Sequence, residues 1–166
     1  MFLKKFFIFI FLLLFSFNSF ASPPRSTGKS KNWESFTVET DEGKICFAQS
    51  TPTKRAPAAV KREKSKLFVT FRPSENINDE ISLTSGHEYK SSTVTARSGK
   101  RSYSFTSKKN FAWIIDDREE KNFIQLMKKA TDVIVKARTV KGAETTDHYS
   151  MMGFTKAYNA AKKNCS

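Results

Sequence analysis

Short segments of alternating apolar and polar residues recur along the chain, and they constrain its fold more than any other feature. Clear examples are WESFTVET (33–40), KLFVTFR (66–72) and RSYSF (101–105). Successive side chains of a strand point to opposite faces, so a period of two indicates strands. The other predicted strands are 44–50, 80–85, 92–97, 110–115, 132–140 and 144–150. Many short strands separated by turn sequences predict a mainly β domain, an antiparallel β-sandwich or a barrel-like sheet.

Two segments have the helical period instead. The first follows Asp117 and Glu120, whose spacing matches a capping box, and its apolar stripe is Phe123, Leu126, Met127 and Ala130. The second is C-terminal, with Ser150 as its predicted N-cap, and its apolar stripe is Met151, Phe154, Tyr158, Ala161 and Cys165. At 100° per residue this spacing keeps Cys165 on the apolar side. The sequence therefore predicts two short helices beside the strands.

The N-terminus has the layout of a secretory signal peptide. Lys4 and Lys5 precede the uncharged run FFIFIFLLLF (6–15), and Ser19-Phe20-Ala21 offers small residues for cleavage after Ala21. An uncleaved membrane anchor is the alternative, because the apolar run is near the length of a span. Cleavage predicts a periplasmic or secreted product, with outer-membrane association as a further option.

Removal of residues 1–21 leaves 145 residues, and the loss of two lysines lowers the net charge from +13 to +11. This length suits one domain with one core. Residues 22–32 are rich in Pro, Ser and Lys and predict a flexible N-terminal arm. We therefore expect a single β-rich domain over 33–166, with no transmembrane segment after signal removal.

Two cysteines remain, Cys46 on a predicted early strand and Cys165 at the end of the second helix. In an oxidising compartment such an isolated pair predicts one disulfide. The alternative is two buried free thiols. No C-x-x-C motif and no metal-ligand spacing of Cys and His is present, so we predict no metal site and no cofactor.

The loop between 51 and 66 is the most basic part of the chain. Its candidate anion-binding residues are Lys54, Arg55, Lys61, Arg62, Lys64 and Lys66. Such a cluster attracts lipopolysaccharide, anionic lipid or an acidic polymer. The loop lacks interleaved aromatic residues, which argues against specific single-stranded nucleic acid. The alternative is a charged loop that only faces water.

The segment DHYS (147–150) places Asp147, His148 and Ser150 close together, as in a hydrolase. In a strand, however, Asp147 and Tyr149 face one way while His148 and Ser150 face the other. A catalytic triad needs bonded Ser, His and Asp, which consecutive strand residues do not supply. We therefore predict no catalytic residues and place Asp147 at a polar strand edge. A periplasmic hydrolase that uses His148 or His87 is the weaker alternative.

The chain resembles the invasion-associated locus B family of alphaproteobacterial exported proteins. The similarity runs from Trp33 to Cys165 and is carried by GKICFAQSTP, VTFRPSENINDEISLTSG, FAWI, LMKKA and TTDHYSMMGFTKAYNAAKKNC. The last segment matches the family pattern in order at Asp147, Tyr149, Ser150, Gly153, Phe154, Ala157 and Cys165.

The chain departs from the family at two places. Gly86-His87 stands where the family commonly has Gly-Tyr, and Lys141-Gly142-Ala143 where it often has Arg-Gly-Thr. The resemblance implies an exported, disulfide-bonded β-rich domain with no agreed activity. The expected function is thus a non-enzymatic envelope protein that binds a protein or envelope component, linked to host-cell invasion in pathogenic relatives.

Overall fold

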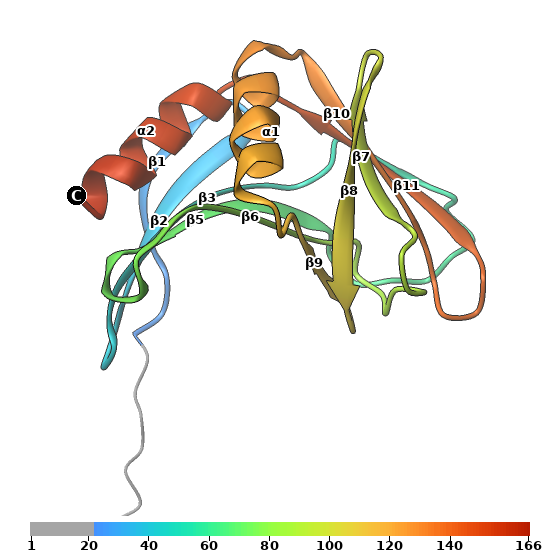
Figure 1. The fold of residues 1–166 in the computed structure, drawn as a ribbon, viewed down its shortest axis with the longest axis horizontal. Helices are drawn as coiled ribbons and strands as arrows, with labels where there is room; N and C mark the ends of the chain where they lie inside the picture. Colours follow the sequence, from blue (N-terminus) through green and yellow to red (C-terminus); the bar gives the residue numbers. More distant parts are fainter. Residues whose placement is uncertain (1–21) are drawn as a thin grey trace, which may run out of the picture.

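A computed structural model describes residues 22–166, so the predicted signal peptide lies outside the described residues. The described chain forms one antiparallel sheet of eleven strands, in the order β1-β2-β3-β5-β6-β9-β8-β7-β10-β11-β4 (Figure 1). The strands are β1 (Arg25–Ser30), β2 (Trp33–Thr40), β3 (Gly43–Ser50), β4 (Lys54–Ala56), β5 (Lys66–Arg72), β6 (Ile77–Thr84), β7 (Val94–Ser98), β8 (Arg101–Lys108), β9 (Phe111–Trp113), β10 (Asp132–Arg138) and β11 (Glu144–Ser150).

Strand β8 joins two halves of the sheet, because it pairs with β9 on one side and with β7 on the other. The first half contains β1, β2, β3, β5, β6 and β9, and the second contains β7, β10, β11 and β4. In Figure 1 the second half stands at a steep angle to the first. Buried side chains of both halves and both helices form one hydrophobic core. The predicted mainly β fold with two helices is confirmed.

Helix α1 (Asp117–Lys129) packs its buried residues Phe123, Ile124 and Met127 into this core. The side chain of Asp116 caps it by accepting a hydrogen bond from the Glu119 amide at 2.8 Å. The predicted capping box of Asp117 and Glu120 is therefore wrong. The Glu120 carboxylate is used elsewhere, because it accepts a hydrogen bond from the Ile81 amide of β6 at 2.6 Å.

Helix α2 (Phe154–Asn164) covers the same side of the first half-sheet as α1, as Figure 1 shows. Its predicted apolar stripe is buried at Phe154, Tyr158 and Ala161. Its N-cap is Gly153 and not Ser150, which still belongs to β11. Gly153 has φ +94°, and a Cβ there would lie 1.8 Å from the Ser30 carbonyl oxygen. Only glycine fits this turn into the helix.

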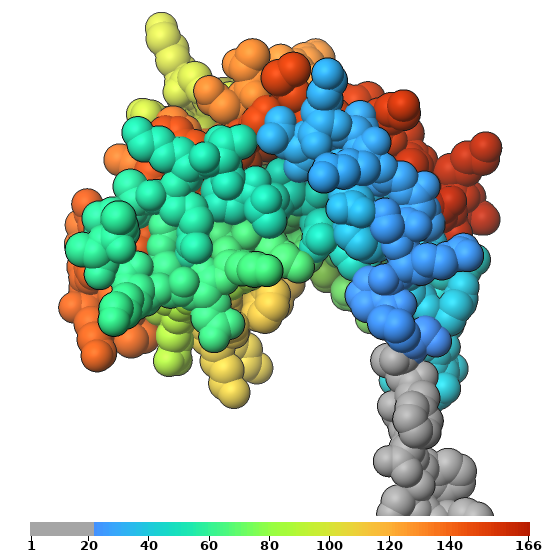
Figure 2. Space-filling view, turned by 180° about the vertical axis from the view of Figure 1, so that it is seen from behind, coloured from blue at the N-terminus to red at the C-terminus, as the bar shows by residue number. Residues whose placement is uncertain are grey.

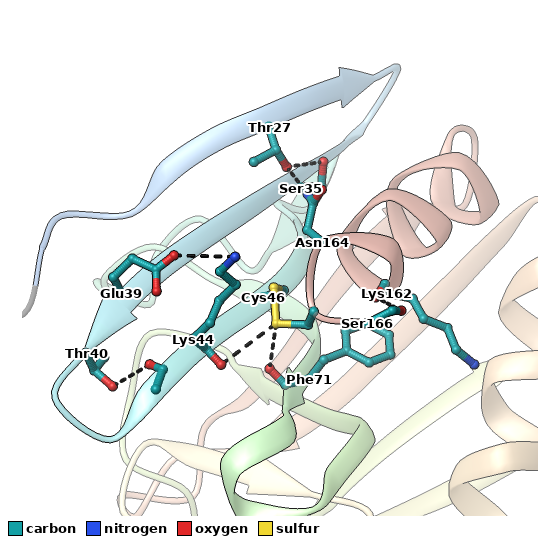
Figure 3. The surroundings of a disulfide bond; sticks show 12 residues. Thr27, Ser35, Glu39, Thr40, Lys44, Cys46, Phe71, Lys162, Asn164 and Ser166 are labelled. Atoms are coloured by element: carbon teal, nitrogen blue, oxygen red, sulfur yellow. Dashed lines mark hydrogen bonds and ion pairs between the residues drawn. A yellow bond between two sulfur atoms is a disulfide. The ribbon is translucent and has the colours of Figure 1, made fainter.

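The predicted disulfide joins Cys46 of β3 to Cys165 after α2, with the two Cα atoms 5.8 Å apart (Figure 3). The carbonyl oxygens of Lys44 and Phe71 lie 3.8 and 3.7 Å from the Cys165 sulfur. A disulfide sulfur carries no proton, so these are packing contacts and not hydrogen bonds. The end of the chain is thereby fixed to an early strand.

The N-terminal segment is not a flexible arm. Its residues 25–30 form strand β1, which pairs with β2 and contains a register shift between Ser26 and Gly28. Thr27 also holds this strand in place. Its hydroxyl donates to the Ser35 hydroxyl at 3.0 Å and accepts from the side-chain amide of Asn164 at 2.9 Å (Figure 3). Composition pointed to disorder, but the open edge of β2 offers backbone partners that the composition does not reveal.

Residues 51–66 contain a further element, strand β4, which pairs with β11 at Lys54, Arg55 and Ala56. The sequence predicted only a surface loop in this region. Within residues 22–166, no helix combines the length and apolar character needed to cross a membrane.

Candidate functional site

One face of the first half-sheet carries a large apolar patch, and no helix of the described residues covers it. Its residues, called here the aromatic face, are Phe36, Val38, Ile45, Phe47, Phe68, Phe111 and Trp113. Strand register places them on one side, since Phe36 lies opposite Phe47, Val38 opposite Ile45, and Ser82 opposite both Phe68 and Trp113. The alternate residues of the same strands, such as Cys46, Ala48 and Val69, point into the core.

The rings of the aromatic face pack against one another. Phe36 and Phe47 stack with centroids 5.1 Å apart, and Phe47 meets Phe68 edge-on at 6.2 Å. Phe111 stacks on Trp113 at 6.1 Å. Phe111 is 38% exposed and the other rings are half-buried. Figure 1 shows both helices on the opposite side of these strands, so this side has no protein cover in the described chain.

This side of the molecule is hollowed. Figure 2 shows a concavity between the N-terminal strands, in blue, and the yellow segment near residue 110. A shallow groove of about 350 Å³ follows the aromatic face from Ile45 to Phe111. Its polar lining comes from Thr70, Ser82 and an ion pair between Arg72 and Glu80.

The charge of Arg72 is neutralised within the protein. Its guanidinium donates two hydrogen bonds to the Glu80 carboxylate, at 3.0 and 2.9 Å, and its Nε lies 3.0 Å from Glu75. The hydrogen bond with Glu80 raises the pKa of Arg72 above its ordinary value. At the Arg72 end of the groove, the sheet therefore presents an ion pair, and the Arg72 guanidinium is not free to bind an external anion.

The basic loop borders the other end of the aromatic face. Lys66 begins β5 on the same side as Phe68, and its Nζ lies 5.8 Å from the centre of that ring. The same Nζ donates to the Gln49 side-chain oxygen at 3.2 Å. Lys64 lines a second groove, of about 330 Å³, which it shares with Phe111. Lys54, Lys61 and Lys64 are exposed.

Arg62 does not belong to that exposed set. Its guanidinium donates to both carboxylate oxygens of Asp147, at 2.8 and 2.6 Å. The Arg62 side chain is 3% exposed and that of Asp147 is 0%. Both predictions for these residues are therefore wrong: Arg62 is not available to an external anion, and Asp147 is not at a polar strand edge. A buried carboxylate requires such a partner, which the basic loop supplies.

Arg55 is also directed inward in part. Its Nε lies 3.8 Å from the Asp147 carboxylate, and its guanidinium donates to the Glu63 carbonyl oxygen. Of the six predicted anion-binding residues, the loop thus leaves four lysines with unpaired charge among residues 22–166, namely Lys54, Lys61, Lys64 and Lys66.

The histidines do not join a serine and an aspartate. His87 Nε2 lies 2.9 Å from the Thr145 hydroxyl, and its Nδ1 lies 3.0 Å from the Glu88 carbonyl oxygen. Burial lowers the pKa of His87. His148 follows Asp147 on the opposite face of β11, and the Ser150 hydroxyl accepts from the Met152 amide at 3.3 Å. The geometry of a Ser-His-Asp triad is therefore not assembled at these residues.

Acidic side chains gather near the start of α1, where Asp79, Glu80, Asp117 and Glu120 line a groove. Burial raises the pKa of Glu120 to about 7, although its hydrogen bond from the Ile81 amide acts in the opposite direction. Within residues 22–166, no three His, Cys, Asp or Glu side chains converge as ligands of a metal ion.

No protein-family model matches this chain, no curated protein is similar to it at a significant level, and no solved structure matches its fold. The resemblance to invasion-associated locus B proteins therefore stays a prediction. The candidate site is defined by its geometry, which is an apolar concave face beside unpaired lysines.

The sequence contained a signal for this face. In KICFAQ and KLFVTF, apolar residues occupy both the odd and the even positions, so both faces of β3 and β5 are apolar. A strand of this kind is normally buried on both sides. Here the helices of residues 22–166 cover only one side, and the second apolar side has no cover from them.

Proposed function

We propose that this chain is an exported cell-envelope protein of the invasion-associated locus B type, which acts by binding and not by catalysis. The observation that carries the proposal is the uncovered aromatic face. Five aromatic rings and two aliphatic side chains lie on one side of a sheet whose other side packs on α1 and α2. Extended apolar surface of this kind marks interaction sites on proteins, because its exposure to water is unfavourable.

The compartment supports the same proposal. A Cys46–Cys165 disulfide is compatible with an extracellular or periplasmic protein, since such bonds persist in oxidising compartments. The signal-like N-terminus agrees with this, and we propose that the protein acts in the periplasm, at the outer membrane or outside the cell. Its partner is a protein or envelope component, and a link to host-cell invasion is proposed for pathogenic relatives.

Co-sedimentation of the mature domain (22–166) with isolated envelope fractions tests this function. We expect the domain to pellet with one fraction, and the double variant Phe47→Ser/Phe68→Ser to stay in the supernatant while keeping its circular dichroism spectrum. A matched control is Val140→Ser/Met152→Ser, which alters two exposed apolar residues outside the aromatic face (56% and 58% exposed). Equal pelleting of both double variants and the unaltered domain would remove the aromatic face as the binding surface.

A second candidate function is anion binding by the basic loop, through Lys54, Lys61, Lys64 and Lys66. The observation that favours it is that these lysines have no carboxylate partner among the described residues. Replacement of Lys61, Lys64 and Lys66 by Gln should weaken retention on immobilised lipopolysaccharide or heparin at low salt. The control variant replaces Lys156, Lys162 and Lys163 of α2, which removes the same charge elsewhere. Equal retention of the two variants would contradict loop-specific binding.

A periplasmic hydrolase using His148 or His87 is the weaker alternative, because neither imidazole contacts a serine hydroxyl among residues 22–166. Ester or peptide hydrolysis that disappears in His148→Ala or His87→Ala, while the fold is retained, would support it and would contradict a pure binding role.

A further inference from the structure

The aromatic face and the basic loop meet, which narrows the chemistry of a ligand. Lys66 belongs to both, since its stem runs beside Phe68 and its Nζ lies over that ring at 5.8 Å. Phe111 likewise lies at the junction, because it lines the groove along the aromatic face and the neighbouring groove that contains Lys64. A ligand lying on the rings therefore ends near the Lys66 ammonium group, with Lys64 in the adjoining groove.

Neither ammonium group forms an ion pair with a carboxylate of the described residues, so both are available to an external anion. The hydrogen-bond partner of Lys66 is the neutral side chain of Gln49, at 3.2 Å. Within residues 22–166 neither Lys64 nor Lys66 lies within an ion-pair distance of a carboxylate, whereas Arg62, Arg72 and Arg138 each do. Glu63 and Glu88 line the groove next to Lys64, so an anion is favoured beside Lys66 and not throughout that groove.

The shape argues for one molecule lying in the hollow. The concavity in Figure 2 is bordered by segments that carry the aromatic face, the N-terminal strands and the segment near residue 110, and a flat membrane surface does not follow such a curve. The groove of about 350 Å³ is lined mainly by apolar side chains, with few polar groups that converge on a point. Phenylalanine and isoleucine offer rings and methyl groups but no hydrogen bonds, which suits a hydrocarbon chain better than a sugar or a peptide backbone.

We propose that the aromatic face binds the acyl chain of a single anionic lipid, whose headgroup lies beside Lys66 at the end of the face nearest Lys64. This inference rests on the proposed function, because it takes the aromatic face as the binding surface. The hydrocarbon chain would remove the rings of Phe47, Phe68 and Trp113 from water. The anionic headgroup would complement the two lysines and the overall charge of +11 expected for the mature domain.

Tryptophan fluorescence offers a direct test, because Trp113 lies on the aromatic face while Trp33 is 0% exposed. The probes are lysophosphatidylglycerol, used below its micelle concentration, lysophosphatidylcholine of the same chain length, and glycerol 1-phosphate. We expect the first to shift the emission of Trp113 to shorter wavelength and to bind at least tenfold more tightly than the second. Glycerol 1-phosphate, which has the headgroup charge without a chain, should give no shift.

Variants separate the two parts of the site. Lys64→Gln/Lys66→Gln should reduce affinity for lysophosphatidylglycerol to that for lysophosphatidylcholine, and Lys156→Gln/Lys163→Gln on α2 should change neither. Phe47→Ser/Phe68→Ser should abolish binding of both lipids. If that variant does not fold, Phe111→Ser serves instead, since Phe111 is the most exposed ring of the face and should weaken both lipids to a similar degree.

The outcomes distinguish this inference from the function on which it rests. Equal affinity for the two lysolipids, or binding that survives in the phenylalanine variants, overturns the anionic-lipid assignment. If lysolipids fail to bind while envelope co-sedimentation still requires Phe47 and Phe68, the face binds a protein or another component, and only the lipid assignment fails. If neither lysolipid binding nor envelope co-sedimentation depends on Phe47 and Phe68, the aromatic face is not a binding surface.

Discussion

At the scale of single residues, the buried pair Arg62–Asp147 explains how the basic loop is held on the sheet. Besides the two bonds to Asp147, the Arg62 guanidinium donates to the carbonyl oxygens of Ser85, at 3.0 Å, and Ala56, at 3.3 Å. It also donates to the Ser65 hydroxyl at 3.3 Å. Nearly every donor of the guanidinium is thus satisfied, which is what a buried cation requires.

We expect Asp147→Asn to destabilise the fold strongly, because it leaves the Arg62 charge buried without a counter-charge. The loss in free energy of unfolding should be about 3–5 kcal/mol, the usual range when one partner of a buried ion pair is removed. Urea unfolding followed by circular dichroism measures it. Lys61→Gln, an exposed neighbour of Arg62, is the control and should change the free energy by less than about 0.5 kcal/mol. Similar losses for the two variants would contradict the buried pair.

At this scale the sequence predicted which way side chains point, but not what they meet. Asp147 and Tyr149 were expected on one face of their strand and His148 on the other, and burial agrees, since the first two are 0% exposed. The partner of Asp147 lies 85 positions away in a loop, so no local pattern could reveal it.

At the scale of elements, α1 and β6 are joined by the half-buried Glu120 carboxylate. It accepts the Ile81 amide hydrogen at 2.6 Å in an acidic neighbourhood that includes Glu80 and Asp117. Burial raises its pKa to about 7 from a reference value of 4.5. The folded protein therefore binds a proton at Glu120 in a pH range where the unfolded chain has released it.

We expect the Glu120 contribution to stability to be complete below pH 4.5 and to decline as pH rises toward 7, because the raised pKa belongs to the folded state. The measurement is the difference in free energy of unfolding between the unaltered protein and Glu120→Gln across this range. Other titrating groups affect both proteins alike. A difference that stays constant, or that increases with pH, would show that Glu120 titrates normally in the folded protein.

The elements themselves were largely predictable. Alternation located β2, β3, β5 and β8, and the helical period located both helices, because these patterns are local. Strands β1 and β4 were missed, since neither has an apolar pattern and each is formed by pairing with the edge of another strand. The helix caps moved by a few residues, because the choice of cap depends on backbone conformation at Asp116 and Gly153.

At the scale of the whole molecule, the disulfide closes nearly the entire domain into a loop. Cys46 and Cys165 are 119 positions apart, and the bond fixes the end of α2 to β3. Together with the Trp33 indole, which donates to the Ser150 carbonyl at 2.9 Å, it holds the first half-sheet to the C-terminal segment.

Removal of the disulfide should lower the free energy of unfolding by roughly 4–5 kcal/mol, the value of the chain-entropy relation for a loop of this length. The comparison is between the oxidised protein and Cys46→Ala/Cys165→Ala, by urea unfolding at one pH. The reduced unaltered protein is the matched control and should behave like the double variant. A loss below about 1 kcal/mol would show that the unfolded chain is not constrained as this relation assumes.

The sequence by itself determined the local features: the strand alternation, the apolar stripes of the two helices, and the face of its strand or helix on which each cysteine lies. These depend on residues close in the chain, whose periods of 2 and 3.6 assign each side chain to a face. Only the tertiary structure decided which apolar face of β3 and β5 the helices would cover, and so left Phe47 and Phe68 outside while burying Cys46 and Val69. It also decided that Arg62 would turn inward to Asp147, because that pairing requires β4, β11 and the loop that follows β4 to be folded together.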